Sequence, residues 1–171
     1  MKTIKKLTAM LLVGAMALSL AACGGSSKKA VTSKEFKKTL EKADFSVEKS
    51  KDKDAEECYE AYYVDEDGET YAYITYYKFE SKKMAKECFS DSYDELKELE
   101  EDELFDGDIT KNSWKFTAEG EFDEDSGIAY GEEAYAVGVL AGDTVLICFS
   151  SADKAGKKVL NKALDSLGYG D

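Results

Sequence analysis

Apolar residues recur every three or four positions in three segments of the chain, and this spacing predicts three helices. The first helix spans about residues 33–43 and begins with a capping box at Thr32. The second begins at Ser81, a residue type that favours the N-cap position. The third spans about residues 152–167, and Gly168 suits the left-handed position that ends a helix.

Runs of β-branched and aromatic residues predict two hairpins between these helices. Residues 58–64 and 70–79 are rich in tyrosine, and the turn between them contains an Asp-Gly pair. Residues 134–140 and 144–149 are almost wholly apolar and flank a second short turn that contains glycine. Each hairpin supplies two antiparallel strands.

Segments 45–48 and 113–118 add further predicted strands. The fold class is therefore α+β, with an antiparallel sheet of about five to six strands and three helices on one face. An offset of 70 residues aligns segment 79–85 with segment 149–155, and each segment joins the second strand of a hairpin to a helix. This match fits a degenerate βββα duplication, and it also fits coincidence, because such elements are common.

The first 23 residues follow a different pattern. Three lysines precede a weakly polar to apolar run over residues 9–19, which is too short to span a bilayer. With the small residues that follow, this arrangement is typical of a secretory signal peptide. The segment ends Leu20-Ala21-Ala22-Cys23, which resembles the lipobox of bacterial lipoproteins. The resemblance implies a diacylglyceryl group on the thiol of Cys23 and cleavage just before it.

The resemblance divides the chain into a signal peptide (1–22), a lipidated flexible tether (23–30) and a single α+β domain (31–171). Two acyl chains anchor a protein stably, whereas one binds only marginally. We therefore expect the chain to be lipid-anchored at the extracytoplasmic face of the cell membrane. The Lys-, Glu- and Tyr-rich domain, which ends Leu167-Gly168-Tyr169, resembles small surface lipoproteins of Gram-positive bacteria, a resemblance that implies no activity.

Composition excludes several classes of function. The chain has 23 lysines and 36 acidic residues, with no arginine, histidine or proline. Its formal charge is −13, and it becomes −16 when residues 1–22 with their three lysines are removed. Such a surface repels nucleic acid. Without histidine there is no Ser-His-Asp triad and no imidazole base, and no P-loop or GxGxxG element is present. Chemistry by carboxylate, lysine, tyrosine, serine or cysteine groups remains.

Ten acidic residues and a single lysine occupy the segment 91–108. Carboxylates at the C-terminal end of a helix face the negative end of its dipole, so this stretch predicts either a frayed, solvated helix end or a bound cation. Calcium prefers oxygen ligands, and Asp102, Asp106 and Asp108 around Gly107 are the candidate ligands. The spacing does not match an EF-hand.

Tyrosine is concentrated in the first predicted hairpin, which holds seven of the eleven tyrosines. The strand period of two places Tyr71, Tyr73 and Tyr77 on one face and Ile74 on the other. An exposed tyrosine row would bind a sugar ring or a peptide, since each ring has an apolar face and a hydroxyl. The alternative is ordinary sheet packing, in which aromatic residues pair across strands.

Three cysteines follow the predicted anchor: Cys58, Cys88 and Cys148. At most one intramolecular disulfide is possible, and one thiol is then left over. Cys148 lies in an apolar strand and is most simply a small core residue.

These observations together predict a non-catalytic, lipid-anchored binding or interaction module on the cell exterior. We expect a monomer that needs no cofactor and has a protein, peptide or glycan partner besides the membrane. One alternative is a small carboxylate- or calcium-dependent surface enzyme, because two carboxylates suffice for glycoside hydrolysis. Another is an accessory solute-binding lipoprotein of a transporter, although the domain is shorter than a two-lobed binding protein.

Overall fold

A computed structural model describes residues 28–68, 70–126 and 133–170, and these form seven strands and three α-helices. The order along the chain is α1 (Ser33–Glu41), β1 (Ser46–Ser50), β2 (Glu57–Val64), β3 (Tyr71–Lys78), α2 (Lys82–Glu101), β4 (Phe105–Lys111), β5 (Lys115–Phe122), a 3-10 turn η2 (Glu124–Ser126), β6 (Glu133–Ala141), β7 (Thr144–Ser151) and α3 (Lys154–Ser166).

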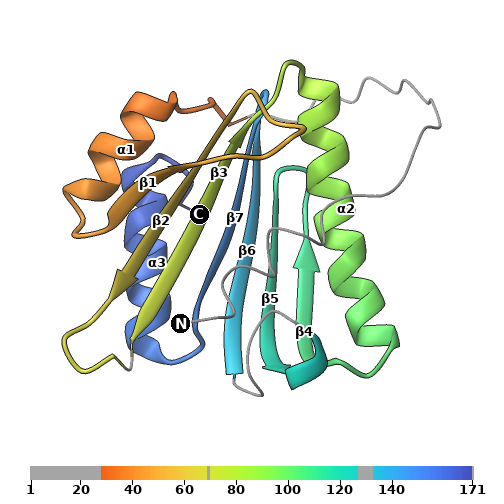
Figure 1. The fold of residues 1–171 in the computed structure, drawn as a ribbon. Coiled ribbons are helices and arrows are strands. Elements are labelled where there is room, and N and C mark those ends of the chain that lie inside the picture. Colours follow the sequence, from red (N-terminus) through yellow and green to blue (C-terminus); the bar gives the residue numbers. More distant parts are fainter. Residues whose placement is uncertain (1–27, 69, 127–132, 171) are drawn as a thin grey trace.

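All seven strands join one antiparallel sheet in the order β1-β2-β3-β7-β6-β5-β4 (Figure 1). The α+β class with an antiparallel sheet and three helices is confirmed, whereas the expected number of five to six strands was too low. The strand that the sequence did not predict is β4, which begins inside the acidic segment 91–108 and ends beyond it at Lys111. Its apolar residues Phe105 and Ile109 alternate with Asp106 and Asp108, so one side of the strand is buried or partly buried and the other is charged.

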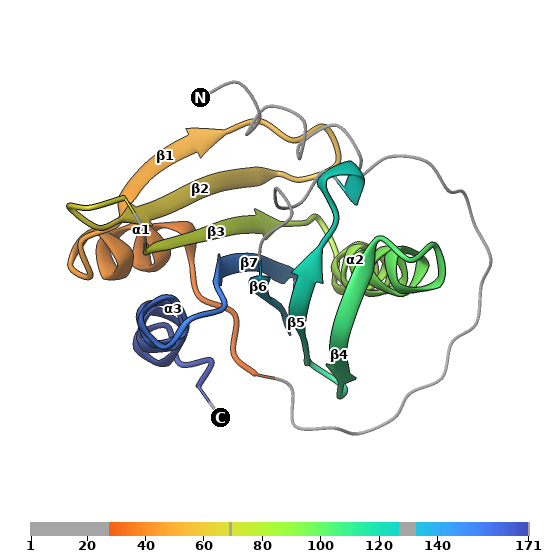
Figure 2. The same cartoon turned by 90° about the horizontal axis from the view of Figure 1, so that it is seen from below.

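The helices lie on both faces of the sheet, so the expectation of helices on one face was wrong (Figure 2). Helices α1 and α3 pack on one face, in a core with Ile74, Tyr76 and Leu146. Helix α2 packs on the other face, in a core with Phe116 and Val145. The central strands are apolar on both sides, and each side therefore needs its own cover.

The two hairpins are related through the central pair of strands, but the helices that follow them are not. The offset of 70 residues maps Tyr76 onto Leu146, and these two residues are direct partners between the antiparallel strands β3 and β7. A two-fold axis at this point would be perpendicular to the sheet and would not exchange its two faces. It would therefore place α2 and α3 on the same face, whereas they cover opposite faces. A βββα duplication does not describe the helices.

The predicted helix ends are present. Thr32 and Glu35 form the reciprocal bonds of a capping box, and the side chain of Ser81 accepts the N–H of Met84. At the end of α3, Gly168 has φ +84° and the N–H of Tyr169 bonds the carbonyl of Leu164 at 2.8 Å. This bond is the long bond of a Schellman motif.

Each sheet face is covered by helix over only part of its width. Helix α2 packs mainly on β4, β6 and β7, so none of the described helices lies over most of the half of this face formed by β1, β2 and β3 (Figures 1 and 2). Helices α1 and α3 pack mainly on β1, β2, β3 and β7, which leaves β4 and β5 uncovered on the opposite face. These two uncovered halves are the places to look for a functional site.

Candidate functional site

The uncovered half on the α2 side carries a row of aromatic side chains that continues onto β7, where Phe149 packs against the α2 core. Tyr62 on β2 pairs with Tyr73 on β3, and Tyr73 pairs in turn with Phe149 on β7. The next pair along the strands is Val64 and Tyr71. We call these five residues the aromatic ladder. Residues directly opposite each other have side chains on the same sheet face, so the aromatic ladder extends over three strands on one face.

The outer end of the aromatic ladder is open to solvent. Tyr62 is 42% exposed and Val64 is 58% exposed, and among the described residues these two are the exposed large hydrophobic side chains. Tyr71, Tyr73 and Phe149 are half-buried. Apolar side chains exposed in one contiguous group are typical of an interaction surface, whereas a single exposed one is ordinary.

The predicted row of Tyr71, Tyr73 and Tyr77 is divided by the fold. All three point to the α2 side, but only Tyr71 and Tyr73 lie in the uncovered half. Tyr77 is 5% exposed and its ring lies 6.2 Å from that of Phe79, inside the core beneath α2. Tyr62, Val64 and Phe149 belong to the same surface but were not among the candidate binding residues predicted from the sequence.

A pair of carboxylates lies beside the aromatic ladder. Glu48 on β1 lies directly opposite Glu60 on β2. The hydroxyl of Ser50 donates to Glu60 at 2.8 Å, and the hydroxyl of Tyr62 donates to Glu48 at 3.4 Å. Burial raises the pKa of the Tyr73 hydroxyl well above its usual range, and the nearby carboxylate of Glu60 adds to the effect. The tyrosine hydroxyl therefore stays protonated beside the carboxylate.

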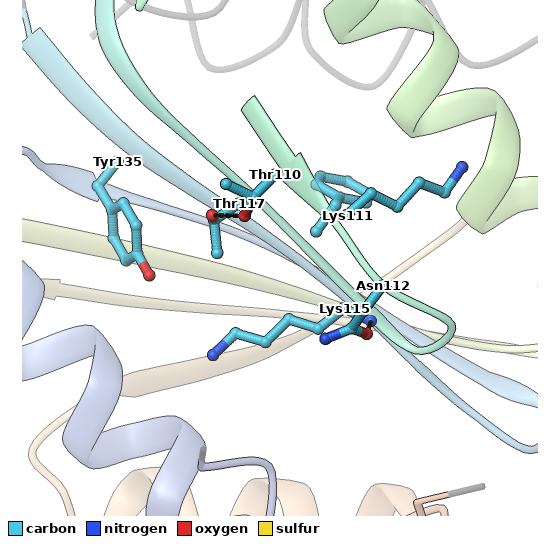
Figure 3. Close-up of a pocket in the computed structure, with 7 residues that line it drawn as sticks. Thr110, Lys111, Asn112, Lys115, Thr117 and Tyr135 are labelled. Carbon is cyan, nitrogen blue, oxygen red and sulfur yellow. Dashed lines mark hydrogen bonds between the residues drawn. The ribbon is translucent and has the colours of Figure 1, made fainter. Parts of the chain in front are cut away.

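The uncovered half on the opposite face holds a shallow polar groove of about 390 Å³ between β4, β5 and β6 (Figure 3). The hydroxyls of Thr110 and Thr117 meet across the two strands at 2.7 Å. Asn112 turns the chain between β4 and β5, because its Oδ1 accepts the N–H groups of Trp114 and Lys115. Tyr135 forms a further wall.

Lysine and aromatic side chains surround this groove. Lys115 is only 7% exposed, and Figure 3 shows its side chain reaching from β5 into the groove. The ammonium of Lys28 lies 4.3 Å from the ring centroid of Trp114. Lys157 on α3 pairs with Glu119 and lies 5.8 Å from the ring centroid of Tyr135. These lysines already have partners within the chain, so the groove offers weaker evidence for a ligand than the aromatic ladder does.

The three candidate calcium ligands are separated in the fold. Asp102 ends α2 as its C-cap, whereas Asp106 and Asp108 lie on β4. Asp106 pairs with Glu121 and Asp108 with Glu119 on β5. Within the described ranges, no three acidic or cysteine side chains lie close enough together to hold a metal ion.

The three cysteines are free thiols in protonating surroundings. Burial raises the pKa of both Cys58 and Cys88 to about 12, and the carboxylate of Asp52 adds to the shift in each case. Cys148 is fully buried on the sheet face that α1 and α3 cover, and burial also raises the pKa of its thiol. A nucleophilic cysteine needs a stabilised thiolate, and these surroundings disfavour one.

The predicted lipidation site, Cys23, lies outside the described residues. Among the helices that the structure does describe, none is long and apolar enough to cross a membrane.

Comparison with known proteins finds a distant structural likeness. No protein family and no curated protein matches the sequence. Among solved structures, the chain is similar to the extracellular domain of PknH from Mycobacterium tuberculosis, with 10% sequence identity and a TM-score of 0.44. The alignment covers 77% of this chain and 69% of that domain. A likeness at this level supports no argument about function.

Proposed function

We propose that this chain is a non-catalytic binding module, held by a lipid on Cys23 at the extracytoplasmic face of the cell membrane, and that its partner docks on the aromatic ladder. The lipobox supports the location. The observation that carries the binding role is the aromatic ladder itself, which leaves Tyr62 and Val64 exposed on a sheet face without a covering helix.

Stability alone gives no reason for this surface. A half-exposed strand position is filled as well by threonine as by tyrosine, and a polar residue there keeps the protein more soluble. The fold also contains fully covered aromatic residues such as Tyr76, which packs 4.9 Å from the ring of Phe36. The chain therefore has a complete core without the outer end of the aromatic ladder.

Site-specific photo-crosslinking of the full chain in its own cells tests the proposal. A photoreactive residue at position 62 or 64 should give a discrete adduct, because these side chains would contact the partner. The same residue at Glu121, on the opposite sheet face, is the matched control and should give none. Absence of adducts at 62, 64 and 73, with the protein correctly located, would contradict the proposed function.

A further inference from the structure

We propose that the partner presents a cationic segment, whose lysine or arginine side chains lie over the tyrosines of the aromatic ladder and against Glu48 and Glu60. This inference rests on the proposed binding function and adds the chemistry of the partner. Three features of the surface support it: its composition, the placement of its carboxylates and the rings beside them.

The composition of the uncovered half differs from that of the chain. Lysine is the sole basic residue type and occurs 23 times. None of these lysines points to the α2 side from the three strands of the uncovered half. The residues that do so are Ser46, Glu48 and Ser50 on β1, Cys58, Glu60, Tyr62 and Val64 on β2, and Tyr71, Tyr73, Thr75 and Tyr77 on β3, of which Cys58, Thr75 and Tyr77 are buried. The formal charge of this surface is therefore wholly negative.

The two carboxylates face each other without a cation between them. Glu48 and Glu60 are direct partners across β1 and β2, and like charges in this position destabilise a sheet. The hydroxyls of Ser50 and Tyr62 bond them but carry no charge to neutralise them. Within the described part of the chain, neither carboxylate has a lysine at ion-pair distance. A cationic group from outside would remove this repulsion.

The rings beside the carboxylates add a second attraction for a cation. The face of a tyrosine ring is negative and attracts ammonium or guanidinium groups. The same contact occurs elsewhere in this protein, where the ammonium of Lys111 lies 3.8 Å from the ring centroid of Tyr93. A sugar would also stack on Tyr62 and Tyr73, but a neutral or acidic glycan would leave Glu48 and Glu60 uncompensated. The surface therefore favours a basic peptide over a glycan.

Titration of the purified full chain with a labelled oligolysine peptide at physiological ionic strength tests this inference. We expect the double variant Glu48→Gln/Glu60→Gln to bind about tenfold more weakly, or worse, a factor that corresponds to about 1.4 kcal/mol. The matched control is Asp108→Asn/Glu121→Gln, which removes the same charge from the opposite face and should bind about as tightly as the wild type. Tyr62→Ser should weaken binding in the same direction as the first double variant. Circular dichroism confirms that each variant is folded.

Several results would overturn the inference. Equal weakening in both double variants would mean that oligolysine follows net charge rather than this surface. No binding of oligolysine, while position 62 still crosslinks in cells, would reject the cationic partner and leave the proposed function standing. Binding of a neutral oligosaccharide that Tyr62→Ser abolishes would assign a glycan to the aromatic ladder instead. Loss of the crosslinks themselves would reject the proposed function as well.

Discussion

A single methyl group added at Gly138 tests the packing between the sheet and α2. Gly138 on β6 is the direct strand partner of Phe116 on β5, and the phenyl ring lies across the glycine. A Cβ at position 138 would lie 2.1 Å from Cε1 of this ring, whereas ordinary contacts begin at 3.4 Å. The ring would have to move by more than an ångström.

Phe116 has no room for such a movement. It is 2% exposed, and on the α2 side its ring lies 5.2 Å from the ring of Phe89 and 6.0 Å from that of Tyr93. Inserting a methyl group into a closed core costs about 1–3 kcal/mol. We therefore expect Gly138→Ala to lower the free energy of unfolding by this amount, although alanine is otherwise better than glycine in a strand by about 0.5–1 kcal/mol.

A double-mutant cycle identifies the cause. Phe116→Ala alone should cost about 3–5 kcal/mol, as truncation of a buried phenylalanine does. In that background the clash is absent, so Gly138→Ala should become neutral or slightly stabilising. Urea denaturation of the four proteins gives the coupling energy, provided that unfolding is two-state. Two results would refute the close contact between Gly138 and the ring of Phe116. One is a free energy of unfolding of Gly138→Ala within about 0.5 kcal/mol of the wild type, and the other is additive effects in the cycle.

Three further predictions concern the anchor and the charges. Cys23→Ala should abolish labelling by a fatty-acid probe in cells, because this thiol is the proposed acyl acceptor. Continued labelling would reject the anchor. Glu121 lies opposite both Asp106 and Glu133. Glu121→Lys should therefore raise the free energy of unfolding, measured by urea denaturation, by about 0.2–1 kcal/mol, and salt should reduce this gain. A loss of stability would contradict the pairing of Glu121 with these two residues. Burial, together with Asp91 and Glu98, raises the pKa of Glu95 from 4.5 to about 7. Its carboxylate therefore opposes folding increasingly as the pH rises from about 4.5 to 7, and Glu95→Gln should gain stability over the wild type at pH 8 more than at pH 5. The gain should be small, because much of the Glu95 side chain still contacts water, which screens the effect. Denaturation curves with the same pH dependence in both proteins would argue against this shift.

Elements marked by a local signal were predictable from the sequence. The capping box at Thr32, the serine cap at Ser81 and the glycine at position 168 each act through the chain's own neighbouring backbone, so their structures follow from residues close in sequence. Strand β4 was missed because its charged residues were interpreted as a solvated helix end, although Phe105 and Ile109 alternate with them as in a half-buried strand.

The arrangement of the candidate site depended on strand register, which the sequence does not contain. Tyr71, Tyr73 and Tyr77 share a face by the period of two, but only the position of α2 decides that Tyr77 is buried and Tyr73 is half-buried. The pairing of Tyr62 with Tyr73 likewise follows from the register of β2 and β3. One available signal was overlooked: the almost wholly apolar segment 134–140 is typical of a strand covered on both faces, which a one-sided arrangement of helices cannot provide.

The contact between the two ends of the domain determines how a mechanical load would enter it. The hydroxyl of Tyr169, near the C-terminus, accepts the N–H of Val31 at 2.9 Å and donates to the carbonyl of Lys29 at 3.1 Å. These bonds hold Lys29 and Val31, at the end of the predicted tether, on the sheet face that carries α3, opposite the face of the aromatic ladder. The hydroxyl of Tyr76 on β3 also donates to the carbonyl of Val31, at 3.2 Å. In the proposed anchored state, a pull by a docked partner would therefore act across the sheet, and the load would be shared between Tyr169 behind α3 and the central strand β3.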